Sequence, residues 1–321
     1  PRSIMHRLIL PGLVLAFSFL SLMIGAIPFS FGALSALDEQ TLHLLIHSRF
    51  PRTLSLLVSG MSLASAGAIM QLMTANRFVT PTTGSTTEWA KLGLLITLLW
   101  VPQASVLTKT LFTFLFAFGG TLSFLLILRN IKLKEAAMVP LIGIIYGNII
   151  SSVTTYLGYR HDLIQSVQSW VQGNFALVLK GRYEVLFLSI PCLVLAVVYA
   201  NRFTVISMGR DISHSLGVRY ATTLQVGLVI VSVISSLVLV TVGVIPFVGL
   251  VIPNIVSLFK GDNLEKNILA IAFSGGLFLL ICDIISRVVI HPFEIPISVT
   301  ASIIGCILFI TFLIYRRHHA A

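Results

Sequence analysis

Residues 220–259 read YATTLQVGLVIVSVISSLVLVTVGVIPFVGLVIPNIVSLF and contain no Asp, Glu, Lys or Arg. A helix needs about 20 apolar residues to cross the hydrocarbon core of a bilayer. The stretch is therefore long enough for two passes, which we place at 220–241 and 243–259. Inside lipid every backbone N–H and C=O group must find a partner within the protein, and a helix supplies these partners within one segment. The stretch predicts two consecutive membrane-spanning helices.

Apolar runs of the same kind continue on both sides of this stretch. The chain has 321 residues, of which 56% are hydrophobic and 10% are charged, whereas soluble domains average roughly 25% charged residues. We therefore expect an all-α polytopic membrane protein of about ten transmembrane helices. The other predicted spans are 8–28, 52–74, 83–101, 108–128, 136–157, 184–200, 267–287 and 296–315.

The positions of Lys and Arg indicate the orientation of these spans. If the N-terminus is cytoplasmic, thirteen of the 21 basic residues lie on the cytoplasmic side, seven lie on the other side and Lys91 lies in a span. Short cytoplasmic loops carry an excess of Lys and Arg in membrane proteins. The bias and the even number of spans place both termini in the cytoplasm. The net charge of +10 then reflects membrane topology, and we expect no nucleic acid partner.

Motifs of enzymatic chemistry are absent from the sequence. It contains no G-x-x-x-x-G-K-[ST] loop for nucleotide phosphates, no H-E-x-x-H helix and no G-x-S-x-G elbow. Its three cysteines lie in separate apolar runs without metal-ligand spacing. We therefore expect a chain that is not an enzyme and that binds no metal or cofactor directly. The loops are too short for a soluble domain, so any ATPase must be another chain.

Four segments carry a family resemblance. The first is Arg49-Phe50-Pro51-Arg52, followed by Gly60, Gly67, Gln71 and Asn76. The second is Val244-Ile245-Pro246-Phe247-Val248-Gly249-Leu250-Val251-Ile252-Pro253-Asn254. The third is Gly209-Arg210-Asp211-Ile212-Ser213-His214-Ser215-Leu216-Gly217-Val218. The fourth is Asp283-Ile284-Ile285-Ser286-Arg287 with Glu294-Ile295-Pro296-Ile297.

These segments resemble, in turn, the R-x-P-R, G-F-x-G-L-x-x-P-H, G-x-x-x-A-x-x-L-G and A-D-x-x-A-R plus E-L-P-x-G patterns of FecCD-type permeases. Those permeases belong to the ABC importers of iron siderophores, haem and cobalamin. The resemblance implies the type II ABC importer permease architecture, with residues 1–321 as a single transmembrane permease domain. In the second segment, Gly249 and the preceding Gly243 allow helix backbones to approach closely.

The arginines of the first and fourth segments are candidate docking residues. The predicted topology puts Arg49, Arg52 and Arg287 at the outer ends of spans. The resemblance implies that they bind acidic residues of a periplasmic or lipid-anchored substrate-binding protein. The alternative is that they are interfacial arginines that extend toward water. Asp283 lies one helical turn before Arg287, and we expect the two to form an i,i+4 ion pair.

The third segment is a candidate contact for the ATPase. Its residue types favour a short helix: Asp211 or Ser213 can cap the start, Leu216 supplies an apolar knob and Gly217 can end it in the left-handed conformation. The resemblance implies that Gly209, Asp211, Ser213, Leu216 and Gly217 belong to the coupling helix that sits on the ATPase subunit. An ordinary solvated loop is the alternative.

Small polar residues in the fifth span are candidates for the translocation pathway. They are Asn148, Ser151, Ser152 and Thr155, and the same span also carries Thr154. The resemblance implies that this helix lines part of the pathway. We add Gln71 to the same group. Residues of this kind also join membrane helices without any role in transport, so both interpretations stay open.

The chain departs from the family patterns at three places. Asn76-Arg77-Phe78 replaces N-P-L, and Pro253-Asn254-Ile255-Val256-Ser257 replaces P-H-x-x-R. The third predicted span carries Glu88 and Lys91, and charges inside a membrane usually have a partner or a function. We expect these two to neutralise each other at i,i+3 spacing, with a polar contact in the pathway as the alternative. This span and the short eighth one are the weakest predictions.

Together these patterns predict a permease subunit that moves ferric siderophores across the bacterial inner membrane by alternating access. Its expected partners are two copies of an ATPase, which consumes the ATP, a substrate-binding protein and a second permease subunit, identical or paralogous. Haem and cobalamin are the alternative cargoes. The alternative mechanism is ion-coupled secondary transport, with Glu88, Lys91 or Asp283 binding or relaying protons.

Overall fold

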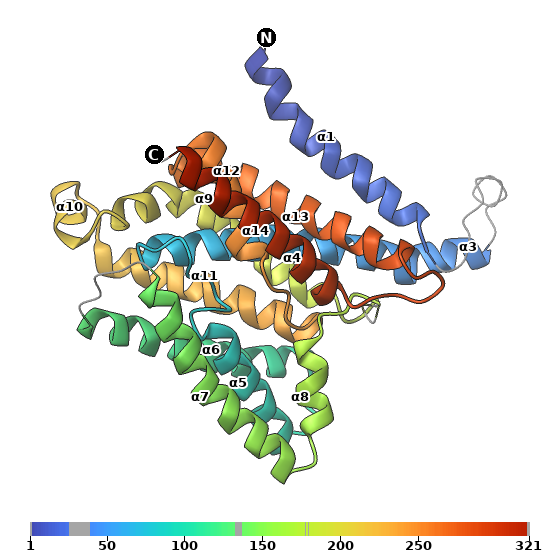
Figure 1. Cartoon of the computed structure of the whole chain (residues 1–321). Coiled ribbons are helices and arrows are strands. Elements are labelled where there is room, and N and C mark those ends of the chain that lie inside the picture. Colours follow the sequence, from blue (N-terminus) through green and yellow to red (C-terminus); the bar gives the residue numbers. More distant parts are fainter. Residues whose placement is uncertain (1, 26–38, 132–136, 177, 179, 320–321) are drawn as a thin grey trace.

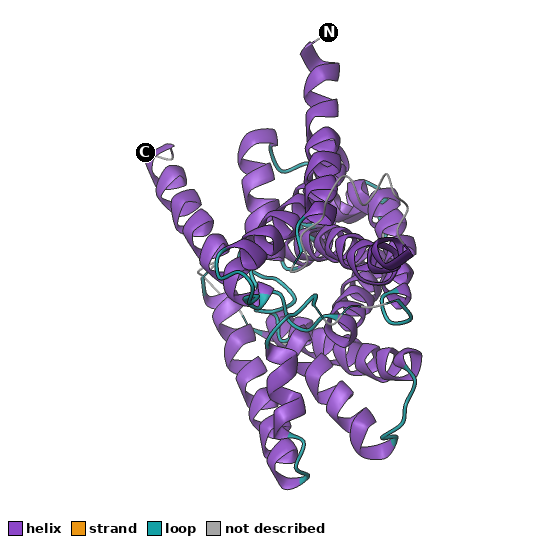
Figure 2. Cartoon of the chain, turned by 90° about the vertical axis from the view of Figure 1, so that its right-hand side faces the viewer, coloured by secondary structure: helices purple, strands orange, loops and turns teal. Residues whose placement is uncertain are grey.

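The computed structural model describes residues 2–25, 39–131, 137–176, 178 and 180–319. Within these ranges every regular element is a helix (Figure 2), which confirms the predicted all-α class. In chain order the elements are α1 (Arg2–Met23), α3 (Glu39–Leu44), the π-helix η1 (Leu45–Arg49), α4 (Phe50–Met73), α5 (Thr86–Trp100), α6 (Val106–Asn130), α7 (Met138–Arg160), α8 (Ile164–Val171), the 3₁₀ helix η2 (Glu184–Leu188), α9 (Ser189–Ile206), α10 (Arg210–Ser215), α11 (Tyr220–Thr241), α12 (Val248–Lys260), α13 (Leu264–Val288) and α14 (Ile297–His319).

Every apolar run that was predicted as a span overlaps a helix, but α5 begins at Thr86 rather than 83 and α12 begins at Val248 rather than 243. The last residues of the first run, 26–28, lie outside the described residues. Among the described residues, seven helices are long and apolar enough to cross a membrane. Two other apolar helices, Ile9–Met23 and α12, are shorter, and α5 has 15 residues. The protein is therefore a multi-pass helical bundle, and the count of ten crossings stays a prediction.

Helix α4 lies at the centre of the bundle. It contacts α13, α12, α11 and α9, and its middle, residues 59–68, is rich in Ser, Ala and Gly. Without a strong hydrophobic force between helices in lipid, association depends on close packing, which small residues permit. The composition of α4 thus explains why neighbours can surround it.

Two glycines of α4 contact the backbones of neighbouring helices. Gly60 lies against Gly275 of α13, and Gly67 lies against Gly249 of α12. At both positions a Cβ atom would overlap backbone atoms of the facing helix. The predicted close approach at Gly249 is confirmed. Gly243, after the end of α11, lies close to the backbone of Trp170 and Gly173, and its φ of +102° is a conformation that favours glycine.

We expect Gly67→Ala to destabilise the protein by about 1–3 kcal/mol, because the added methyl group forces α4 and α12 apart. Gly119→Ala in α6 is the matched control, since apart from its own turn of helix no atom lies within 4 Å of its Cβ position. The control is expected to be neutral or to gain up to about 1 kcal/mol of helix propensity. The measurement is the unfolding temperature of each purified variant in detergent. Equal unfolding temperatures would show that the contact does not constrain the helices.

The bundle has two ends that differ in the elements found there (Figure 1). Helix α10 projects at one end, which we call the α10 end, and α14 finishes at the same end. At the opposite end lie α3, the C-terminal end of α1 and the loop 289–296 between α13 and α14. We call it the arginine end, because Arg49, Arg52 and Arg287 are located there. Helix α13, with 25 residues, extends about 37 Å from one end to the other.

Candidate functional site

Arg52 forms the centre of a charge cluster at the arginine end. Its Nε and Nη2 atoms donate to Asp283 Oδ1 of α13 at 3.2 and 2.8 Å. Its Nη1 atom donates to both carboxylate oxygens of Glu294, at 3.1 and 2.9 Å. The Arg52 side chain is only 13% exposed. Arg52 therefore joins α4 both to α13 and to the loop that precedes α14.

Arg287 joins the same cluster from the inside. Its Nη2 atom lies 2.7 Å from Asp283 Oδ2, which confirms the predicted i,i+4 ion pair. Its Nη1 atom also donates to the carbonyl oxygens of Ser21 and Ile24, at 3.0 and 2.5 Å. These carbonyls belong to the C-terminal end of α1, where backbone acceptors lack partners within the helix. The Arg287 side chain, 5% exposed, anchors α1 to α13.

Arg49, the last residue of η1, also binds the end of α1. Its Nη1 atom donates to the carbonyl oxygens of Leu22 and Met23, at 2.9 and 3.4 Å. The three predicted docking arginines are thus brought to one end of the bundle, but these contacts of Arg49 are to α1, whereas those of Arg52 are to Asp283 and Glu294. Arg287 is directed into the protein rather than toward solvent. Their docking role stays a prediction.

The cluster balances its own charge. It contains two guanidinium groups, Arg52 and Arg287, and two carboxylates, Asp283 and Glu294. Asp283 is 1% exposed, and a buried charge is tolerated only when it is paired. Sequence reasoning found the local pair but missed the contacts of Arg52, because Asp283 and Glu294 are 231 and 242 positions away along the chain. These contacts could have been suspected from the sequence, because both acids lie at the same predicted end of the spans as the arginines.

Helix α10 forms the candidate coupling element at the other end. Gly209 and Gly217 flank it with φ angles of +106° and +73°, so the predicted left-handed end at Gly217 is confirmed. The predicted capping by Asp211 or Ser213 is wrong, because no side chain caps α10. Ser213 is buried and donates instead to the carbonyls of Gly209 and Val205, at 2.7 and 3.3 Å. This serine fixes α10 to the end of α9.

An exposed apolar ridge follows one side of α10. It consists of three exposed residues: Met208, in the turn before α10, and Ile212 and Leu216. Ile212 and Leu216 lie on the same face of the helix because they are four residues apart. We call these three residues the α10 ridge. An exposed apolar patch of this kind, beyond the end of the bundle, is typical of a protein-binding surface. The sequence pointed to Leu216 alone and missed the other two.

Two of the four candidate polar residues of α7, Asn148 and Ser152, lie on the side turned away from its neighbours. Asn148 and Ser152 are exposed, and Ser151 and Thr155 are partly exposed. The opposite face, which is buried, consists of Gly143, Gly147, Ile150, Thr154 and Gly158. Gln71 does not join this group: its Nε2 atom donates to the Gly249 carbonyl of α12 at 3.2 Å. Whether these residues line a pathway stays a prediction.

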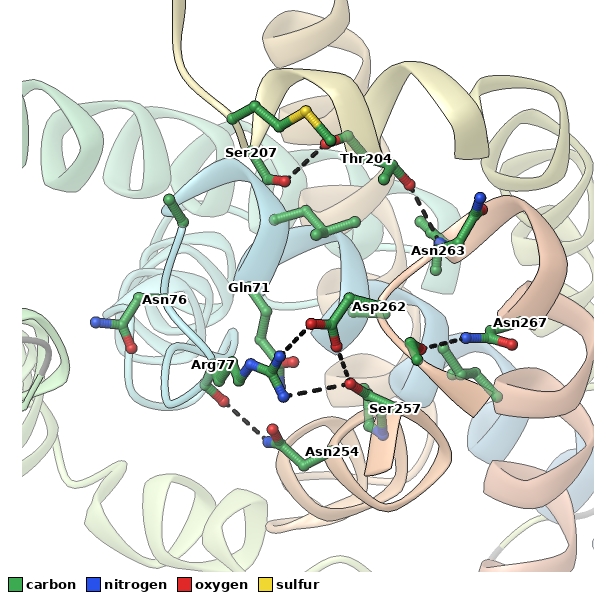
Figure 3. A pocket seen from close by; sticks show the side chains of 18 residues that line it. Gln71, Asn76, Arg77, Thr204, Ser207, Asn254, Ser257, Asp262, Asn263 and Asn267 are labelled. Carbon is green, nitrogen blue, oxygen red and sulfur yellow. Dashed lines mark hydrogen bonds and ion pairs between the residues drawn. The ribbon is translucent and has the colours of Figure 1, made fainter. Parts of the chain in front are cut away.

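A cavity of about 450 Å³ opens at the α10 end, between the ends of α4, α9, α12 and α13 (Figure 3). At its edge Arg77 forms an ion pair with Asp262, and Ser257 donates to the same carboxylate. Asn254 Nδ2 donates to the Arg77 carbonyl at 2.9 Å. Three residues that depart from the family patterns, Arg77, Asn254 and Ser257, therefore meet at one place, where they connect α12 to the segment after α4.

The charged pair of α5 is internally neutralised. Lys91 Nζ donates to Glu88 Oε1 at 2.8 Å, as predicted from their spacing. Both side chains are mostly buried. An ion pair within one turn explains how α5 can pack against α6 and α7 while carrying two charges.

Comparison with known proteins identifies relatives along the whole length of the chain. The model of the FecCD transport family matches residues 13–316. The chain is 45% identical over 308 residues to the petrobactin import system permease protein YclN of Bacillus subtilis, covering 96% of this chain and 98% of that protein. It is 40% identical over 305 residues to the ferric-anguibactin transport system permease protein FatD of Vibrio anguillarum, covering 94% and 97%.

The fold also matches a solved structure. That structure is described as an inward-facing conformation of a metal-chelate type ABC transporter. The TM-score is 0.81 at 24% sequence identity, and the match covers 95% of this chain and 97% of the other. The likeness supports the permease architecture that the motifs predicted.

Proposed function

The chain belongs to the FecCD transport family, and we propose that it is the membrane-spanning subunit of an ABC importer for ferric siderophores. One observation carries this proposal: two relatives that match almost end to end are named for the import of petrobactin and of ferric anguibactin. The proposed cargo is accordingly an iron complex of a siderophore rather than haem or cobalamin.

The proposed location is the bacterial inner membrane, with both termini and the α10 end in the cytoplasm. This orientation rests on the excess of Lys and Arg in the loops assigned to that side. The arginine end then faces outward and receives the substrate-binding protein. The α10 ridge faces inward and sits on the ATPase, whose motion it transmits.

A second permease subunit completes the pathway in this proposal. The polar side of α7, with Asn148 and Ser152, is exposed, although α7 is long and apolar enough to cross the membrane. Polar groups in a membrane generally face other helices or a water-filled cavity. Two subunits with these sides facing each other would enclose a central path. ATP binding and hydrolysis by two partner ATPases then change which side is open, which is a rigid-body switch.

A crosslinking experiment tests both docking faces. Phe293, in the loop at the arginine end, and Phe259, near the C-terminal end of α12, are 74% and 76% exposed and lie at opposite ends of α13. Each is replaced in turn by the photoreactive analogue benzoylphenylalanine, in cells that express the neighbouring transport genes. We expect position 293 to crosslink to the binding protein and position 259 to the ATPase. Crosslinks in the reverse sense would overturn the proposed orientation, and none at position 293 would overturn the outer docking face.

The cargo is tested by uptake in cells that lack their own siderophore permeases. Cells that express this chain with its partners are offered ferric petrobactin, ferric anguibactin, haem and cobalamin separately. We expect uptake of at least one ferric siderophore and none of haem or cobalamin. Uptake of cobalamin or haem alone would reassign the cargo.

A further inference from the structure

We propose that Glu294 is an internal competitor for the docking carboxylate: it occupies the outward edge of Arg52, and an acidic residue of the substrate-binding protein must displace it. Glu294 would thereby set the affinity of the permease for its binding protein. This inference rests on the proposed docking function of the arginine end and adds a residue that controls it.

The hydrogen bonds of Arg52 leave little free donor capacity. Asp283 accepts from Nε and Nη2, and Glu294 accepts from Nη1 through both of its oxygens. A guanidinium binds carboxylates best along an edge where two donors point the same way. One such edge of Arg52 is already taken by Asp283, so a carboxylate that arrives from outside must share or replace the Glu294 contact.

The two acids differ in how readily they can be replaced. Asp283 is 1% exposed and also pairs with Arg287, so removing it would leave a second guanidinium without its partner. Glu294 is 28% exposed, lies in the loop 289–296 between α13 and α14, and pairs with Arg52 alone among the described residues. Exposed ion pairs contribute only about 0–1 kcal/mol. Glu294 is therefore the acid that can leave.

The exchange also conserves the charge of the cluster. With Glu294 in place, two guanidinium groups face two carboxylates. When Glu294 moves into solvent, the cluster carries one excess positive charge at the outer surface. A carboxylate on an acidic patch of the binding protein restores the balance, whereas an amide or a hydroxyl does not. The fitting partner is thus an Asp or Glu side chain.

The first measurement tests the internal contact without any partner. Phenylglyoxal, which modifies accessible guanidinium groups, is applied to the permease in nanodiscs, and modification at Arg52 is followed by mass spectrometry. We expect Glu294→Gln to increase the rate at Arg52 severalfold and to leave Arg287 unreactive. The control is Asp162→Asn, an exposed acid just after the end of α7, whose φ of +58° is one that Asn tolerates. An unchanged rate at Arg52 would overturn the inference.

The second measurement uses the purified binding protein encoded beside this permease. The apparent affinity is reduced in proportion to the fraction of permease molecules in which Arg52 is free to bind. Removing the Glu294 contact should therefore raise the affinity for the binding protein, by about fivefold for an ion pair of this kind. By the predicted topology both variants lose one negative charge on the outer side of the membrane, so the gain in affinity of Glu294→Gln must exceed that of Asp162→Asn. Equal affinities of the two variants would overturn the inference even if Arg52 became reactive. No binding to any variant would refute the docking proposal itself, whatever the reactivity of Arg52.

Discussion

Arg287→Met is expected to lower the free energy of unfolding by roughly 3–5 kcal/mol, the usual cost of removing one partner of a buried ion pair. Asp283, 1% exposed, would keep a full charge with one partner fewer. The carbonyls of Ser21 and Ile24 at the end of α1 would lose their donor as well. The measurement is denaturant or thermal unfolding of the purified protein in detergent.

Arg182→Met is the matched control for this prediction. Arg182 is exposed and forms no ion pair within the described part of the chain, so we expect a change within about 0.5 kcal/mol. If Arg287→Met has the same free energy of unfolding as the control but a lower affinity for the substrate-binding protein, Arg287 is a docking residue and its anchoring role is refuted.

Replacing Ile212 and Leu216 together with Asp is expected to reduce ATP-driven transport at least tenfold. Both side chains are exposed, so the permease itself should accumulate normally. Burying a carboxylate in an apolar groove of the ATPase costs free energy. A loss of about 1.4 kcal/mol in binding free energy is enough to weaken the binding tenfold. The measurement is the amount of ATPase that copurifies with the permease, together with uptake.

The control for the α10 ridge adds a charge to the same helix. His214→Asp places it on the side away from the α10 ridge, since residue 214 is two positions from 212 and two from 216. We expect this variant to retain most of its ATPase binding. Equal loss in both variants would mean that charge on α10, and not the apolar ridge, governs the contact.

The helices could be predicted from the sequence because their signal is local. The length and hydrophobicity of each apolar run are enough to predict a helix without knowledge of the rest of the chain. For α11 the predicted bounds, 220–241, are the observed ones. The pair of Glu88 and Lys91 and that of Asp283 and Arg287 were also predictable, because helix geometry fixes which residues three or four positions apart can meet.

The rest of the site depends on contacts that no local pattern encodes. The bonds from Arg52 to Asp283 and Glu294 exist only because α4 packs beside α13, and that packing depends on Gly60 meeting Gly275. The capping prediction for α10 failed for a similar reason. A serine in a short helix can cap its start or donate a hydrogen bond to a preceding carbonyl. Ser213 does the second, because the Val205 carbonyl at the end of α9 lies within its reach.

Reconstituted transport is the most direct test of the central claim that this chain is an ABC importer permease. The permease is placed in liposomes with the ATPase and binding protein encoded beside it, and uptake of a radiolabelled ferric siderophore is followed. We predict uptake only when both partners and ATP are present, unchanged when proton and sodium gradients are dissipated. Uptake by the permease alone, driven by such a gradient and indifferent to ATP, would contradict the account.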